Sequence, residues 1–270
     1  MQKRYTGDIG DFGKLGLLRQ LSRTGLSIGV NWYLTPDETH NGDGRHIGYL
    51  KNDAFRACDE QLWSVLGQIV GSGKRQVSAL ERPDILQASF YSRVLDFTGA
   101  DKTERQMLRW EWHNRAMQQL QNCDIIFVDP DNGLIVPSAD GTPKSNKFVL
   151  PFELVEYYRA GSSVIYYQHK ARRSDEFYIE QNNQLVESGG FFGAKSLGLK
   201  FRTTSQRYYF FLVQPSHAEA MVRCIEQMIS TPWKNHFEIL YYENLSPSGR
   251  GRAARRGFPC RVGSVTFVRR

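Results

Sequence analysis

The stretch Asp124-Ile-Ile-Phe-Val-Asp129-Pro130-Asp131-Asn132-Gly133-Leu134 decides the fold class of this chain. Its four apolar residues, 125–128, predict a short strand buried on both faces, as in a parallel sheet covered by helices. Proline removes an amide donor and glycine permits a positive φ, so the chain turns directly after this strand. Asp129 and Asp131 are therefore expected at the carboxyl end of a strand, where ligands bind in open α/β sheets. An ordinary turn uses the same residue types, so the other loops must decide.

Candidate strands and helices alternate along the rest of the chain. Strands are expected at 27–34, 75–80, 163–167, 194–201 and 207–213, and helices at 15–21, 51–70, 102–121, 151–158 and from 215 onward. This alternation predicts an α/β fold with a Rossmann-like sheet, helices on both faces and room for antiparallel strands at its end. In helix 102–121, Met107 and Trp110 are expected to face inward and Arg109 outward. Residues 137–147, rich in Pro, Gly, Ser, Asp and Lys, predict an exposed flap.

Composition limits the class of protein. The 270 residues are 40% hydrophobic and 13% aromatic, which suffices for a globular core. The sequence contains no apolar run of membrane-spanning length, and residues 1–5 lack a signal-peptide pattern, so we expect a cytoplasmic protein without a membrane partner. The four cysteines form no CxxC pair, which argues against a zinc site or a disulfide framework.

The positive charge is concentrated at the C-terminal end. Residues 246–270 contain seven arginines and no acidic residue, so removing them leaves 35 − 7 = 28 basic against 28 acidic residues. We therefore divide the chain into a domain at 1–245 and an Arg-rich tail at 246–270. The planar guanidinium group of arginine can donate paired hydrogen bonds to phosphate oxygens. The candidate nucleic-acid contacts are therefore Arg250, Arg252, Arg255 and Arg256. A solvated end without a ligand is the alternative interpretation.

Two further loops have the composition of ligand-binding segments. Gly7-Asp8-Ile-Gly10-Asp11-Phe-Gly13-Lys14 is glycine-rich and enters a helix, where Lys14 could meet an anion. The strand at 27–34 runs into Asp37-Glu-Thr-His40-Asn-Gly42-Asp43-Gly44-Arg45, and a Gly-x-Gly pair after a strand allows a nucleotide-like ligand to approach the backbone. A capped helix entry and a hairpin turn are the respective alternatives.

The order of these motifs resembles the bacterial family that methylates an adenine N6 of 23S ribosomal RNA, the J type, which has a class I S-adenosylmethionine-dependent methyltransferase fold. That family has a Gly-Asn-x-x-Asp-x-x-Lys loop, where this chain has residues 7–14. Its Asp-Thr-His-Ala-Gly-x-Gly-Arg cofactor loop is similar to residues 37–45, with one extra residue here. Its Thr-Glu-x-x-Pro and Asp-Pro-Pro-Tyr motifs match Leu80-Glu81-Arg-Pro83 and Asp129-Pro130-Asp131-Asn132. The likeness covers residues 5 to 230 in order and spacing.

The resemblance implies a methyltransferase-type sheet and a base amino group of nucleic acid as the substrate. It assigns cofactor contacts to Lys14, Asp37, His40, Gly42, Gly44 and Glu81, and catalytic roles to Asp129, Asp131 and Asn132. In this pattern the first aspartate accepts a hydrogen bond from the amine while an aromatic residue stacks on the flipped base. Asn132 replaces that aromatic residue, so stacking must come from elsewhere, for example Tyr166, Tyr167 or Trp32.

The acidic residues also permit a second interpretation. Asp129, Asp131, Asp37 and Asp43 are all expected near one sheet edge, and clustered carboxylates can hold Mg²⁺ or Mn²⁺ for phosphodiester hydrolysis. On this hypothesis the protein is a metal-dependent nuclease on a methyltransferase-like scaffold, with Lys170 stabilising developing charge. A non-catalytic nucleic-acid-binding protein is the third hypothesis. The sequence does not indicate an oligomeric state.

Overall fold

The computed structural model describes residues 2–37, 46–203 and 205–243. In these ranges the α-helices and strands are α1 Ile9–Leu21, β1 Ile28–Asn31, α2 Asp53–Arg56, α3 Glu60–Gly71, β2 Ser89–Tyr91, α4 Lys102–Leu120, β3 Ile125–Val128, β4 Gly133–Leu134, β5 Phe148–Val149, α5 Pro151–Arg159, β6 Ser163–His169, α6 Asp175–Glu187, β7 Lys195–Phe201, β8 Arg207–Val213, α7 Ala218–Ile229 and β9 Phe237–Glu243. Short 3-10 turns lie at Lys3–Tyr5, Ser22–Thr24, Gly48–Lys51, Val77–Ala79, Pro143–Lys147 and Pro232–Asn235.

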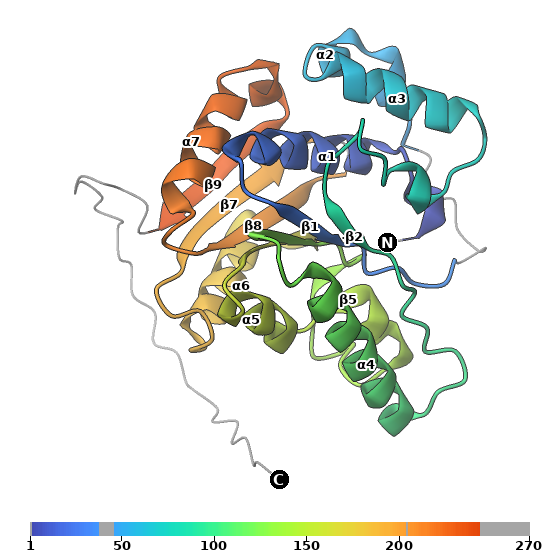
Figure 1. Cartoon of the computed structure of the whole chain (residues 1–270), viewed down its shortest axis with the longest axis vertical. Helices are drawn as coiled ribbons and strands as arrows, with labels where there is room; N and C mark the ends of the chain where they lie inside the picture. Colours follow the sequence, from blue (N-terminus) through green and yellow to red (C-terminus); the bar gives the residue numbers. More distant parts are fainter. Residues whose placement is uncertain (1, 38–45, 204, 244–270) are drawn as a thin grey trace.

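One seven-stranded sheet organises the molecule, with the strand order β2-β1-β3-β6-β8-β7-β9 (Figure 1). Strands β2, β1, β3 and β6 run parallel, and the pairs β6–β8, β8–β7 and β7–β9 are antiparallel. A separate two-stranded ribbon joins β4 to β5. The predicted Rossmann-like α/β fold with antiparallel strands at one end is therefore confirmed.

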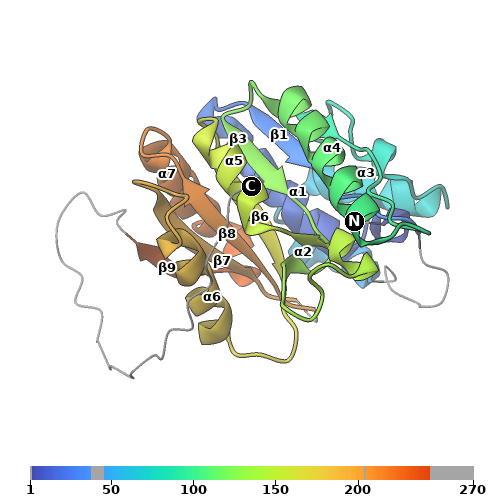
Figure 2. The same ribbon diagram turned by 90° about the horizontal axis from the view of Figure 1, so that it is seen from below.

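Helices cover both faces of the sheet and create two hydrophobic cores. Helices α1, α3 and α7 lie on one face, and α4, α5 and α6 lie on the other (Figures 1 and 2). Successive side chains of a strand point to opposite faces. Ile125 and Phe127 of β3 accordingly join the core beneath α1, while Ile126 and Val128 join the core beneath α4 and α5. The four-residue apolar run predicted to be buried on both faces is fully buried.

Three expectations from the sequence are wrong. Residues 75–80 form no strand, because Val77–Ala79 is a 3-10 turn, and the strand beside β1 is β2. The helix expected at 51–70 is broken into α2 and α3. Helix α4 has its expected bounds to within one residue, but Met107 and Trp110 are exposed and Arg109 is buried.

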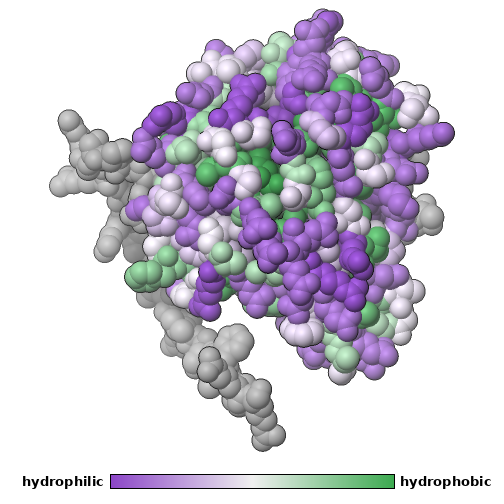
Figure 3. Space-filling model, in the orientation of Figure 1, coloured by the Kyte–Doolittle hydropathy of each residue, from purple (hydrophilic) through white to green (hydrophobic). Residues whose placement is uncertain are grey.

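The surface facing the viewer in Figure 3 is largely hydrophilic, with hydrophobic residues grouped near its middle. Within residues 2–37, 46–203 and 205–243, no helix has the length and apolarity needed to cross a bilayer.

A buried ion pair holds α4 against α5. The Arg109 guanidinium donates to both carboxylate oxygens of Glu153, each at 2.8 Å, and also to the backbone oxygens of Ser145 and Phe148 at 2.9 and 2.6 Å. Glu153 lies in the first turn of α5, and its carboxylate also accepts a hydrogen bond from the Tyr33 hydroxyl. Burial opposes ionisation of Glu153, but Arg109 outweighs it and lowers the pKa of the carboxyl group.

Replacing Arg109 with Ala is expected to lower the free energy of unfolding by roughly 3–5 kcal/mol, because it leaves the Glu153 charge buried without its cation. Urea unfolding of the variant and the wild type measures the difference. Arg115→Ala is the control on the same helix, since Arg115 and its partner Glu111 are both about half exposed. That variant should stay within about 0.5 kcal/mol of the wild type. Equal effects of the two substitutions would contradict this account of α4.

Candidate functional site

The candidate site lies where the order of the parallel strands changes direction. From β1 the chain first adds β2 on one side and later adds β3 on the other side. In open α/β sheets, ligands bind outside the carboxyl ends of the strands at such a switch point. The residues after β1 and after β3 meet there, and α1, which leads into β1, brings its N-terminal turn to the same edge. Asp129 directly follows β3, as predicted.

Lys14 and Asp129 form the central contact of this edge. The Lys14 ammonium on α1 donates a short hydrogen bond to the Asp129 carboxylate, and its Nζ lies 3.1 Å from Asp11 Oδ1. Lys14 is 5% exposed, Asp129 3% and Asp11 1%, so the three charges lie out of contact with bulk water. The interaction joins residues that are 115 positions apart in the sequence. It attaches the first helix to the loop after the central strand.

The N-terminal glycine-rich loop is built as a capped helix entry. Asp8 is the N-cap of α1, and its Oδ1 accepts hydrogen bonds from the amides of Gly10 and Asp11 at 2.7 and 3.0 Å. The Asp11 carboxylate also accepts from the Gly7 amide at 2.9 Å. Gly10 lets the Arg207 side chain approach, because a Cβ there would lie 2.8 Å from the guanidinium and would displace it. The capped turn therefore fixes the backbone from which Lys14 reaches the sheet edge.

The charged groups in this cluster shift one another's pKa values. Burial raises the pKa of Asp129 above its usual value, while Lys14 acts in the opposite direction. Burial also favours the neutral form of Lys14, but Asp129 and Asp11 outweigh it and raise the pKa of the ammonium. Lys14 consequently stays charged at physiological pH. A carboxylate with a raised pKa is a stronger hydrogen-bond acceptor, and this one is held in a fixed orientation by its cation.

Glu81 is attached to the same edge through Trp32, which follows β1. The indole Nε1 of Trp32 donates to Glu81 Oε1 at 2.9 Å, and the Ser92 hydroxyl, just after β2, donates a short hydrogen bond to the same oxygen. The Lys14 ammonium lies 5.3 Å from the centre of the Trp32 ring. Glu81 is half-buried. The structure thus links the predicted residues Lys14 and Glu81 through one aromatic side chain.

The remaining motif residues have different surroundings. Asp131 is half-buried, and its Oδ2 accepts a hydrogen bond from Gln2 Nε2 at 3.2 Å. The backbone of Asn132 donates to the Lys147 carbonyl at 3.0 Å and accepts from Gln168 Nε2 at 3.0 Å. The backbone bonds of Asn132 therefore tie the loop after β3 to β6 and to the segment before β5.

Among the predicted residues that the structure describes, Asp37 is not part of this cluster. Asp37 is exposed and interacts with Lys3, through the Lys3 amide at 2.9 Å and the ammonium at 3.5 Å. Four predicted cofactor or metal contacts and four predicted nucleic-acid contacts lie outside the described residues: His40, Gly42, Asp43, Gly44, Arg250, Arg252, Arg255 and Arg256.

The geometry bears on the alternative metal site. In the parts of the chain that the structure describes, no three His, Cys, Asp or Glu side chains are arranged to hold a metal ion. Among the residues named for that site, Asp129 is paired with Lys14 and Asp37 with Lys3. The positive charge beside Asp129 therefore comes from an ammonium group of the protein.

Sequence reasoning missed residues that complete the cluster. A cavity of about 60 Å³ is lined by Tyr5, Asp8, Gly10, Asp11, Lys14, Asp129, Pro130, Asp131, Tyr167 and Arg207. Arg207 begins β8, and its Nη2 lies 4.0 Å from Asp8 Oδ2. Because β8 runs antiparallel to β6, its first residue lies opposite His169 at the carboxyl end of β6. Of the three aromatic residues considered for stacking, Tyr167 lines this cavity. Tyr166 instead donates to Asn182 Oδ1 at 2.9 Å in the other core.

Comparisons with known proteins add little to this picture. No protein-family model matches the sequence, and no curated protein matches it. Among solved structures, the chain is similar to the crystal structure of protein LPL1258 from Legionella pneumophila str. Philadelphia 1, described as a protein of the family model DUF519. The identity is 9% and the TM-score 0.43, over 87% of this chain and 96% of that chain. A likeness of this degree carries no argument about function.

Replacing Lys14 with Met is expected to destabilise the fold by roughly 3–5 kcal/mol near neutral pH. A carboxyl group whose pKa is raised by folding stabilises the native state below its unfolded pKa, and this contribution is lost as the pH rises through the native pKa. Without Lys14 the pKa values of Asp11 and Asp129, already raised by burial, rise further. The variant should therefore approach wild-type stability as the pH is lowered from 7 toward the usual pKa of aspartate, about 3.9.

Denaturant unfolding at several pH values measures this difference. Lys3→Met is the matched control, because Lys3 forms an exposed pair with Asp37. Its effect should be within about 1 kcal/mol at every pH. A Lys14→Met deficit that stays constant with pH would show that the two buried carboxyl groups do not depend on this ammonium.

Proposed function

We propose that this protein is an S-adenosylmethionine-dependent methyltransferase-like protein that acts on a base amino group in nucleic acid. The observation that supports it most is the position of Asp129. It lies at the switch point of a Rossmann-like sheet, is followed by proline, and is oriented by Lys14 beside the small cavity. Together with the motif order in the sequence, this position favours methyl transfer over the other two hypotheses.

The described residues fit one part of such a cofactor. A carboxylate accepts hydrogen bonds from ribose hydroxyl groups, and Glu81 presents one at the ends of β1 and β2. The cavity beside Asp129, at about 60 Å³, is far below the roughly 300–1,000 Å³ of small-molecule pockets, so it suits only the reacting end of a ligand. When bound, the cofactor supplies an electrophilic methyl group.

The residues of this chain would prepare the acceptor. An amino group that donates a hydrogen bond to Asp129 is oriented by it, and the raised pKa of this carboxyl group strengthens that bond. Lys14 keeps the carboxylate in place, and Asp131 adds a second acceptor at the half-buried rim of the cavity. Tyr167, which also lines the cavity, is the candidate for contact with the base plane in the absence of an aromatic residue at position 132.

Calorimetric titration tests the cofactor site. Wild-type protein should bind S-adenosylmethionine, and Glu81→Gln should bind it at least tenfold more weakly, because the neutral amide cannot form charge-assisted bonds to the ribose hydroxyls. Asp84→Asn is the control, since Asp84 is exposed and paired with Arg82. The metal-dependent hypothesis would be established instead if S-adenosylmethionine gave no heat of binding and Mg²⁺ or Mn²⁺ gave a heat of binding that disappeared in Asp129→Asn.

Deleting residues 246–270 tests the predicted role of the arginine tail. For every phosphate group that the tail neutralises, the deletion should reduce the slope of log affinity against log salt by about 0.7 for single-stranded nucleic acid. Affinity for a labelled oligonucleotide, measured over a series of salt concentrations, gives this slope. A slope equal to that of the full chain would remove the tail from the binding surface.

A further inference from the structure

The largest departure from the predicted pattern in α4 is the exposure of Trp110. Trp110 is 65% exposed in the middle of a long helix, and Phe152 at the start of α5 is 43% exposed. Large apolar side chains are usually buried, because their contact with water is unfavourable. Their exposure side by side is therefore typical of a binding surface. Both side chains line one pocket of about 280 Å³ between the two helices.

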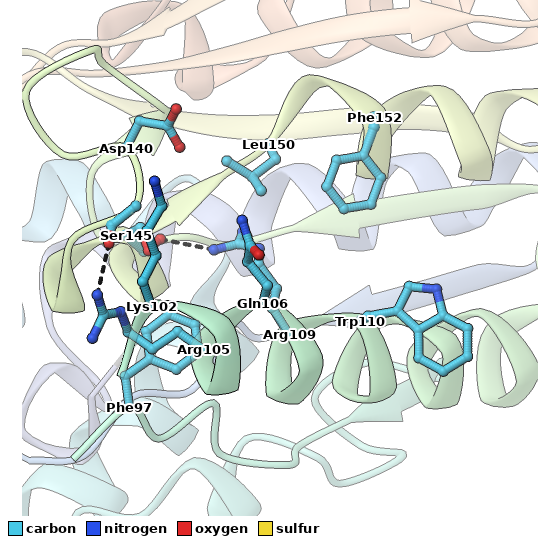
Figure 4. Close-up of a pocket in the computed structure, with 11 residues that line it drawn as sticks. Phe97, Lys102, Arg105, Gln106, Arg109, Trp110, Asp140, Ser145, Leu150 and Phe152 are labelled. Carbon is cyan, nitrogen blue, oxygen red and sulfur yellow. Dashed lines mark hydrogen bonds between the residues drawn. The ribbon is translucent and has the colours of Figure 1, made fainter. Parts of the chain in front are cut away.

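This pocket has two chemically different ends. Figure 4 shows Trp110 and Phe152 at one end, projecting from α4 and α5, and Lys102 and Arg105 at the other end near Asp140. Gln106 lies between the two ends. Lys102, Gln106 and Trp110 are spaced four residues apart along α4 and therefore lie on one face of the helix.

The wall opposite α4 is held rigidly in place. Arg105 donates to the carbonyl of Gly141 at 2.8 Å, and Arg109 donates to that of Ser145 at 2.9 Å. This wall belongs to the segment 137–147 that the sequence predicted as an exposed flap, and it is packed against α4. The segment follows β4, which begins directly after Asn132. The pocket wall is thus continuous in sequence with the Asp129 loop.

The charges of the pocket favour an anionic ligand. Of the charged residues that line it, Lys102, Arg105 and Arg109 are basic and Asp140 is acidic. Arg109 is neutralised by Glu153, which leaves Lys102 and Arg105 against one carboxylate. In the part of the chain that the structure describes, Lys102 forms no ion pair, and exposed Lys144 lies on the 3-10 turn that carries Ser145.

We propose that this pocket binds one unpaired nucleotide of a single-stranded nucleic acid, with the base against Trp110 and Phe152 and a phosphate at Lys102. Aromatic faces stack on bases of any sequence, and a nearby cation holds the backbone. The amide of Gln106 matches the donors and acceptors on a base edge. The inference rests on the proposed function in that it takes the substrate to be nucleic acid, and it specifies a single-stranded segment as the substrate.

Fluorescence anisotropy with a labelled oligothymidylate of about twelve nucleotides tests the proposal on the full chain without cofactor. Trp110→Ala should weaken binding by about tenfold or more, since base stacking on one aromatic residue has effects of this size. Trp110→Phe should restore most of the affinity. Met107→Ala is the matched control, because Met107 is 60% exposed on the same helix and does not line the pocket. Its affinity should equal that of the wild type.

Three further measurements complete the test. Lys102→Glu should weaken binding, and a duplex of the same length should bind more weakly than the single strand. Trp110→Ala should leave thermal unfolding unchanged, since the side chain is largely exposed.

The outcomes separate the pocket from the proposed reaction. If the oligonucleotide binds and Trp110→Ala binds equally well, the pocket assignment fails while the methyl-transfer proposal stands. If the wild type binds no oligonucleotide, the pocket assignment fails, and the titration with S-adenosylmethionine decides the methyl-transfer proposal on its own. If Trp110→Ala weakens binding but S-adenosylmethionine gives no heat, the pocket stands and methyl transfer fails. A concentration-dependent dimer that Met107→Ala and Trp110→Ala both abolish, without single-strand binding, would assign this face to a second copy of the chain.

Discussion

The buried contact between Lys14 and Asp129 is the constraint on which the rest of the site depends. It joins the first helix to the loop after the central strand, across 115 residues of sequence. Three acidic residues, Asp8, Asp11 and Asp129, approach one another at this edge, and burying that much negative charge without a cation would be costly. Lys14 and Arg207 supply the compensating charge. The same arrangement places a carboxylate of raised pKa at the switch point of the sheet.

Local patterns predicted the central strand, the sheet class and the bounds of α4, because these features depend on residues that lie close together in the sequence. They failed at 75–80, where Val77 and Leu80 are buried with the spacing of three that a 3-10 turn produces. They also predicted the wrong face of α4 to be buried. Burial of Arg109 depends on Glu153, which is 44 residues away, and no local pattern contains that information.

For the site, the sequence predicted that residues after different strands would gather at one edge, and Lys14, Glu81, Asp129 and Asp131 do lie there. It could not predict that Asp37 would pair with Lys3, because the two residues are 34 positions apart and no local pattern joins them. Arg207 was missed because it begins a strand, and only the antiparallel direction of β8 brings a strand's first residue to this edge. The methyl-transfer and nucleotide-pocket proposals use two regions that the segment from Asp129 to Ser145 connects in sequence.

Hydrogen exchange, measured by mass spectrometry with and without S-adenosylmethionine, reports where the ligand stabilises the fold and so tests whether the cofactor binds at this edge of the sheet. We expect added protection in peptides that cover residues 7–14, 31–34 and 129–133, where α1, the end of β1 and the loop after β3 meet. Protection of the α4–α5 surface alone, or unchanged exchange at saturating cofactor, would contradict the assignment of this edge as the cofactor site.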